Sequence, residues 1–264
     1  MIEESKDEYL SPEVMTEPYS RFLRDIQKLF AFVSLVFVLA EHVDETTDAI
    51  MQLASLTNAK TAHLANELKP RGRAGEVLTY YWQALIQMVF CRGVNSYLTY
   101  ISELLALIFQ MRPETMKSQE QVSVEEVLQY ESMDDLISGL AERLVYRLSY
   151  KGMKDLAAHL SSRLKFDLFA KDDQYERAVR IIEVRNLLVH NRGVVNRIFL
   201  SRVPDLNMRP GETMKLSLDA VDDLTFLVRS ASDIDMRAAE KFGLPQPVSR
   251  EQLNEEAAGL LLEA

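Results

Sequence analysis

The strongest chemical signal in the sequence is an arginine and a histidine set five residues apart, Arg185 and His190. Both lie near the end of the segment Gln174–His190, whose apolar residues recur at helical spacing. An arginine binds phosphate through paired hydrogen bonds, and a histidine changes its protonation near neutral pH. The two residue types are therefore suited to acid–base chemistry at a phosphate group.

The helical spacing places Arg185 in the middle of an apolar face. At about 100° per residue, that face also carries five apolar residues, which are Ala178, Ile181, Ile182, Leu188 and Val189. A charge there is costly unless an opposite charge or a strong acceptor meets it. Two solutions stay open, a carboxylate from another helix or an anion bound in an interface cleft. Asn186 and His190 are i, i+4 neighbours, and His190 lies about 140° from Arg185 around an ideal helix.

The residues around this pair form a basic window in an acidic chain. From Arg177 to Arg202 there are six arginines and one acid, Glu183, so the window carries +5 in a chain of net charge −10. An acidic protein repels nucleic acid, so an RNA partner requires a local basic patch of this kind. A solvated basic face is the alternative. We expect an anionic ligand, contacted by Arg177, Arg180, Asn191, Arg192 and Arg197.

The segment Arg185-Asn186-Leu187-Leu188-Val189-His190 resembles the Arg-x(4–6)-His motif of the HEPN domain family. Its continuation through Asn191-Arg192-Gly193-Val194-Val195 is similar to a subset of bacterial members, the RiboL-PSP-HEPN-like proteins. The resemblance covers about residues 75–242 and says nothing about residues 1–70. It implies an up-and-down helical bundle, usually dimeric, in which the motifs of two protomers face each other across a cleft.

Many members of this family are metal-independent endoribonucleases. The resemblance implies that His190 acts as general base or acid on the ribose 2′-OH or the leaving oxygen. It implies that Arg185 stabilises charge on the scissile phosphate and that Asn186 holds His190 or the phosphate by hydrogen bonds. Attack by the 2′-OH makes RNA the substrate and gives a cyclic phosphate and a 5′-hydroxyl. We expect no metal and no other cofactor.

The same resemblance implies a toxin or antiphage defence role, with an antitoxin or regulatory protein as a possible partner. Some members carry a tyrosine two residues after the histidine, which a nucleotidyltransferase antitoxin modifies; here that residue is Arg192, which argues against this route.

A non-catalytic helical dimer that binds RNA or a protein partner is the alternative function. Because Arg185 and His190 lie on different faces of an ideal helix, we expect a homodimer with a shared active site.

The remaining sequence predicts an all-α protein. With only 9 glycines and 8 prolines among 264 residues, long helices are favoured over a many-turned β fold. We expect an N-terminal helical extension at 1–70 with about 18 poorly ordered residues at its start, a HEPN-like helical domain at 71–245, and a loose acidic tail at 246–264. Helices are predicted over Tyr19–Lys69 (one or two), Glu76–Met111, Ser123–Tyr130, Ser132–Lys151, Met153–Phe169, Asp173–His190 and Ser217–Phe242.

Two apolar features have ordinary structural explanations. The run Leu29–Ala40 is shorter than the ~20 residues that a membrane span requires, so we expect a helix buried on most sides and no membrane partner. The aromatic cluster Tyr80–Trp82 is expected in the core, where aromatic residues at helical spacing usually lie, instead of stacking on bases. Gly93 is expected to mark a bend or a close helix contact.

The remaining polar residues give no competing catalytic site. His63 and Glu67, at i and i+4, are expected to be a surface pair, while His42 and His159 are expected to be structural. No phosphate-binding glycine loop, HExxH motif or GxSxG motif is present. One cysteine, Cys91, forms no intramolecular disulfide, and the acidic first 18 residues do not resemble an export signal, so we expect a cytoplasmic protein.

Overall fold

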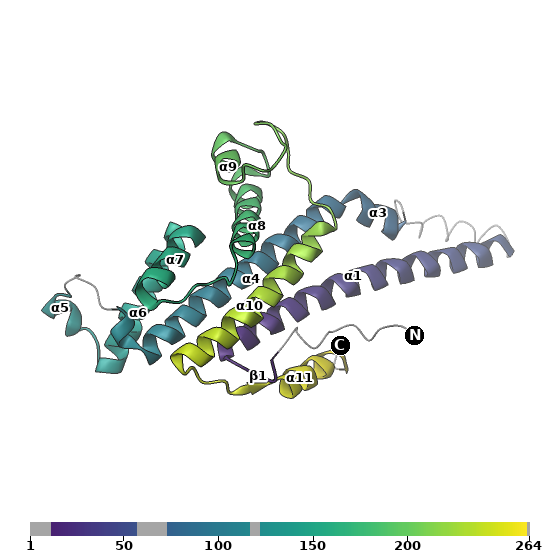
Figure 1. Ribbon diagram of the computed structural model, residues 1–264. Helices are drawn as coiled ribbons and strands as arrows, with labels where there is room; N and C mark the ends of the chain where they lie inside the picture. Colours follow the sequence, from purple (N-terminus) through teal and green to yellow (C-terminus); the bar gives the residue numbers. More distant parts are fainter. Residues whose placement is uncertain (1–11, 57–72, 117–121, 263–264) are drawn as a thin grey trace, which may run out of the picture.

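The computed structural model describes residues 12–56, 73–116 and 122–262, and over these ranges the chain is an all-α helical bundle. This confirms the predicted fold class. The central helix is α4 (Trp82–Met111), and four other long helices pack around it (Figure 1). They are α1 (Glu17–Leu56), α6 (Met133–Lys151), α8 (Asp172–Asn191) and α10 (Asp219–Phe242).

Helix α4 is central because apolar residues occur around most of its circumference. Phe90, Tyr97, Leu104 and Phe109 are all buried. The sequence predicted either a bend or a close helix contact at Gly93. The structure has the close contact, because a Cβ there would lie 2.5 Å from a methyl carbon of Leu224 on α10.

The helix predicted over Glu76–Met111 is divided into two elements. A turn at Tyr81 separates α3 (Ala74–Tyr80) from α4. The prediction that the aromatic cluster lies in the core is wrong for two of its three residues, because Tyr80 is 80% exposed and Tyr81 is also exposed. Only Trp82 is half-buried, with its ring centroid 6.3 Å from that of Phe37 on α1.

The first turns of α1 belong to the core of the bundle, where Tyr19, Phe22, Leu23 and Ile26 are buried. Farther along, α1 extends beyond the other helices, as Figure 1 shows. The prediction that Leu29–Ala40 is buried on most sides is wrong: Val38 is 61% exposed, and only 11% of the most apolar window of this helix is buried. By length and composition alone, Glu17–Thr46 could cross a membrane.

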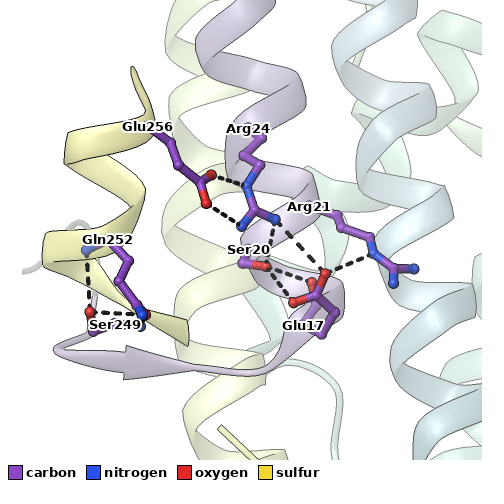
Figure 2. A network of polar contacts seen from close by, with 7 residues as sticks. All are labelled: Glu17, Ser20, Arg21, Arg24, Ser249, Gln252 and Glu256. Carbon is purple, nitrogen blue, oxygen red and sulfur yellow. Dashed lines mark hydrogen bonds and ion pairs between the residues drawn. The ribbon is translucent and has the colours of Figure 1, made fainter. Parts of the chain in front are cut away.

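Both ends of the described chain are fixed to the bundle. β1 (Val14–Met15) pairs antiparallel with β2 (Val248–Ser249), and α11 (Arg250–Leu262) follows β2. An ion pair of 2.7 Å between Arg24 Nε and Glu256 Oε2 holds α11 against α1 (Figure 2). Ser249 and Gln252 form a reciprocal cap at the start of α11. The expected disorder before residue 18 is therefore wrong for residues 14–18, and the expected loose tail is wrong for residues 248–262.

The remaining elements follow local signals in the sequence. The backbone N–H of Asp135 donates to Ser132 Oγ at 3.1 Å at the start of α6, and the N–H of Asp219 donates to Ser217 Oγ at 3.4 Å before α10. The segment predicted as one helix over Met153–Phe169 instead ends early. It consists of α7 (Met153–His159) and one π-helical turn. The shorter elements are a 3₁₀ turn at Pro113–Met116, α5 (Val124–Val127), the π-helical turn Leu160–Leu164 and α9 (Arg197–Arg202).

Candidate functional site

Helix α8 carries the predicted site, and its ends follow from local chemistry. It begins at Asp172, where two aspartates in the first turn favour the positive end of the helix dipole. It ends at Asn191, because Arg192 and Gly193 adopt left-handed φ angles of 54° and 75°. The backbone N–H of Gly193 donates to the carbonyl of Leu187 at 3.0 Å, which satisfies a free carbonyl at the helix end.

One face of α8 packs into the bundle as the spacing predicts. Ala178, Ile181, Ile182 and Leu188 are all buried. Val189, expected on the same face, is exposed, so this prediction is wrong; Leu187 is buried in its place. The chain after α8 folds back, and the N–H of Met214 donates to the carbonyl of Gly193 at 2.8 Å. The burial around the last turn is therefore set by this returning segment as well as by α4.

Arg185 is half-buried on this face and is held by two amide oxygens. Its Nε donates to Asn95 Oδ1 on α4 at 2.7 Å, and its Nη1 donates to Asn186 Oδ1 at 2.8 Å. Within the described ranges, no carboxylate lies at ion-pair distance from this guanidinium. An amide oxygen accepts a hydrogen bond but carries no net charge. The positive charge of Arg185 therefore lies among apolar residues, and no described residue supplies its counter-charge.

Two residues of α4 complete the surroundings of Arg185, and the sequence analysis did not assign them to the site. They are Asn95 and the half-buried Cys91, four residues earlier. Burial raises the pKa of the Cys91 thiol, and the positive charge of Arg185 acts in the opposite direction. The available signal was Asn95 itself, because an amide in a largely apolar helix requires a hydrogen-bond partner.

His190 and Asn191 lie in the last turn of α8. His190 is exposed, and its imidazole makes no hydrogen bond to Arg185 or Asn186. Asn186, expected to orient His190 or the phosphate, accepts a hydrogen bond from Arg185. Asn191, expected to contact RNA, closes the turn after the helix: its Nδ2 donates to the carbonyl of Val194, and its own carbonyl accepts the N–H of Val194 at 2.9 Å. The structure thus joins Arg185 with Asn186 and leaves His190 apart.

The basic window divides into paired and open arginines. Arg177 forms an ion pair of 2.9 Å with Asp223, and its guanidinium carbon lies 4.6 Å from the ring centroid of Phe226. Arg202 pairs with Glu183 at 3.1 Å. The three other arginines besides Arg185 are exposed and form no ion pair with any described residue; they are Arg180, Arg192 and Arg197. Among the arginines expected to contact RNA, Arg177 is therefore the one whose charge a described carboxylate neutralises.

The remaining histidines lie away from this site or outside the described residues. His42 is exposed on α1, His159 is half-buried at the end of α7, and the pair His63 and Glu67 lies outside the described ranges. In the part of the chain that the structure describes, no group of three or more His, Cys, Asp or Glu side chains is arranged to hold a metal ion.

Comparisons of the chain with protein-family models, with curated proteins and with solved structures gave no match. The family resemblance therefore rests on residues 185–195 and on their place at the end of a helix in an all-α bundle.

Proposed function

We propose that this protein is a metal-independent endoribonuclease of the HEPN type. The observation that carries the proposal is the guanidinium of Arg185, which two amides hold in place without a neutralising carboxylate among the described residues. Such a preorganised cation attracts the charge that builds on a phosphate in the transition state. The exposed His190 and the exposed arginines Arg180, Arg192 and Arg197 lie on the same helix or just after it.

The proposed reaction uses no group beyond the protein and the RNA. His190 removes the proton from a ribose 2′-OH, and the 2′ oxygen attacks the adjacent phosphorus. The bond from phosphorus to the 5′ oxygen breaks, and this leaving oxygen takes up a proton from an acid in the site. The products are a 2′,3′-cyclic phosphate and a 5′-hydroxyl. Arg185 stabilises the extra negative charge on the phosphoryl oxygens at the midpoint of this exchange.

A site shared between two copies fits the separation of the two side chains. Arg185 faces α4, while His190 is exposed at the end of α8. In the proposed homodimer, the Arg185 of one protomer and the His190 of its partner act on one phosphate. A defence or toxin role, and a regulator that controls it, belong to the proposal only through the family resemblance.

The test is cleavage of a mixed RNA substrate in the presence of EDTA, with end-group analysis of the products. We expect the wild type to cleave and to leave cyclic phosphate and 5′-hydroxyl ends. We expect His190→Ala to lose about 10²–10⁴-fold in rate, because this is the usual contribution of a general acid–base residue. Loss of wild-type cleavage in EDTA, or a wild-type rate for His190→Ala, would disprove the mechanism.

Mixing two inactive variants tests the shared site. If one active centre takes Arg185 from one protomer and His190 from the other, a heterodimer of Arg185→Ala with His190→Ala contains one intact centre. Cleavage should then return to a substantial fraction of the wild-type rate when the two variants are mixed and exchange subunits. If both residues act within one protomer, every centre in the mixture lacks one of them and no activity returns.

A non-catalytic dimer that binds RNA through the same face is the second candidate. It is favoured by one observation: Asn186, the residue expected to orient the imidazole, is hydrogen-bonded to Arg185. Binding of the same RNA without cleavage, lost in Arg185→Ala and kept in His190→Ala, would support this candidate against the nuclease.

A further inference from the structure

Helix α1 exposes an apolar face between its buried first turns and its far end. We call it the outer face of α1, formed by Ala31, Phe32, Leu35, Val38 and Leu39. At 100° per residue, these side chains lie within about 60° of Leu35. All five are exposed, and Phe32 retains 56% of its accessible surface. Adjacent exposed aromatic and aliphatic residues of this kind mark an interaction surface.

The opposite side of the same helix is already covered. Phe37 contacts the ring of Trp82, and Asp44 accepts hydrogen bonds from the backbone N–H groups of Ala74 and Gly75. These contacts dock α1 onto α3 and the start of α4. A helix that is apolar all round requires cover on both sides. Among the described elements, α3 and α4 cover one side of this part of α1, and the ion pair of α11 with Arg24 lies before the outer face. The outer face therefore lacks a partner among the described residues.

The charges at the two ends of the outer face have opposite signs. Lys28 is exposed one turn before Ala31 and lies about 20° from Leu35 around the helix, and Glu45 is exposed after Leu39 and lies about 80° from Leu35. Glu45 forms no ion pair with another described residue. If two copies of α1 lie antiparallel, the Lys28 end of one meets the Glu45 end of the other. In a parallel arrangement, like charges would meet instead.

The chemistry of this region argues against lipid or nucleic acid as the occupant. The uncharged run Leu29–Ala40 extends for about 18 Å at 1.5 Å per residue, short of a hydrocarbon core of about 30 Å. The longer segment Glu17–Thr46 has the length and composition to cross a membrane, but its first turns are buried in the bundle, at Tyr19, Phe22 and Ile26. Ionic groups limit it on the covered side as well, with the Asp25–Arg92 ion pair of 3.1 Å before it and Asp44 after it. The acidic residues at its far end repel anionic headgroups and phosphates.

We propose that the outer face of α1 binds a second copy of this chain in an antiparallel arrangement, with a twofold axis close to Leu35. Such an interface is self-complementary, because the same patch and the same charge pairs are used by both copies. It is distinct from the shared site proposed on α8, since α8 and α9 rise on the other side of α4 from α1 (Figure 1). The proposal therefore stands whether or not the protein cleaves RNA.

The first test is sedimentation velocity of the full chain over a range of concentrations. Leu35→Glu places a charge at the proposed axis. It should weaken one step of self-association and raise the dissociation constant of that step at least tenfold. Leu218→Glu is the matched control, because Leu218 is also an exposed leucine but lies outside α1. Circular dichroism and thermal unfolding verify that both variants remain folded, as expected for substitutions of exposed residues. Identical association of the two folded variants would overturn the proposal.

The second test identifies the surface and the orientation. Leu35→Cys should form an intermolecular disulfide under mild oxidation, whereas Leu218→Cys, which also keeps Cys91, should not. Lys28→Glu and Glu45→Lys should each weaken association, and the double variant should recover it. No recovery in the double variant would overturn the antiparallel arrangement. Co-sedimentation of the wild type with neutral phosphatidylcholine vesicles, lost in Leu35→Glu, would instead assign the face to a bilayer.

Discussion

Two charged side chains on apolar helix faces, Asp235 and Arg185, are handled in opposite ways by this fold. Asp235 on α10 is completely buried, and its carboxylate accepts the backbone N–H of Thr16 at 3.1 Å and the Thr16 hydroxyl at 2.5 Å. It joins the start of α1 to the bundle. Arg185 is half-buried, meets two neutral amides, and has no described counter-charge.

The two residues differ as a structural charge differs from an available one. Asp235 uses its acceptor capacity inside the protein, so removing it leaves buried donors without partners. Arg185 retains its charge and part of its exposure, so its removal should cost little stability and much function. Residues kept for function at a small cost in stability show this pattern.

The largest effect on stability is expected for Asp235→Ala. Removal of the carboxylate leaves the N–H and hydroxyl of Thr16 buried without an acceptor, which should cost about 2–4 kcal/mol. Urea denaturation, monitored by circular dichroism, measures this cost. Asp233→Ala on the same helix is the control, since its half-buried i, i+4 ion pair with Arg237 should contribute less than about 1 kcal/mol. Equal losses in the two variants would remove Asp235 from its structural role.

A pH dependence follows from the same carboxylate. Burial raises the pKa of Asp235 from 3.8 to about 6, although the hydrogen bonds from Thr16 and Tyr100 oppose this shift. Between these values the folded state binds the proton more tightly than the unfolded state. The contribution of Asp235 to the free energy of unfolding should therefore fall as pH rises through this window, by up to about 1.4 kcal/mol per pH unit.

Asp235→Asn isolates this contribution from those of other titrating groups. The difference in free energy of unfolding between the variant and the wild type should change steadily from pH 4 to pH 6 and become constant above it. A difference that does not change with pH across this window would show that the pKa of Asp235 is not raised.

For Arg185→Met, the free energy of unfolding should change by less than about 1 kcal/mol, because replacing a poorly compensated charge with an apolar side chain of similar length is often neutral. Arg177→Met is the matched control. It should lower the free energy of unfolding by more than Arg185→Met, since it leaves Asp223 without its ion-pair partner and Phe226 without its cation. A loss of more than about 2 kcal/mol in Arg185→Met would make Arg185 a structural residue like Asp235.

The smallest effect concerns the thiol of Cys91. The charge of Arg185 lowers the pKa that burial raises, so Arg185→Met should raise this pKa further. Alkylation by iodoacetamide at pH 8 should slow by a factor of a few, since the thiolate is the reacting species. Arg177→Met should leave the rate unchanged. Faster alkylation in Arg185→Met would show that opening of the site outweighs the charge.

The sequence predicted those parts of the fold that depend on neighbouring residues. The end of α8 was evident because Gly193 follows His190, and the cap at Ser132 was evident from its spacing. The cap predicted at Ser217 is wrong by one residue, because Leu218 is the N-cap of α10 and its side chain caps no backbone N–H. The contact of Arg185 with Asn95 could not be predicted, because it joins positions 90 residues apart and depends on how α8 crosses α4. The exposure of Phe32 and Val38 was missed because periodicity identifies apolar residues and not what covers them.

The role of Arg185 is tested most directly by the rate of metal-free RNA cleavage by Arg185→Met and Arg177→Met, measured in EDTA at saturating enzyme on preparations of verified fold. Both variants lose one arginine from the same basic helix, but only Arg185 carries a charge that no described carboxylate neutralises. We expect Arg185→Met to lose at least about 100-fold and Arg177→Met less than about 3-fold. Equal losses in the two variants, or full activity in Arg185→Met, would show that Arg185 is not the functional cation of this fold.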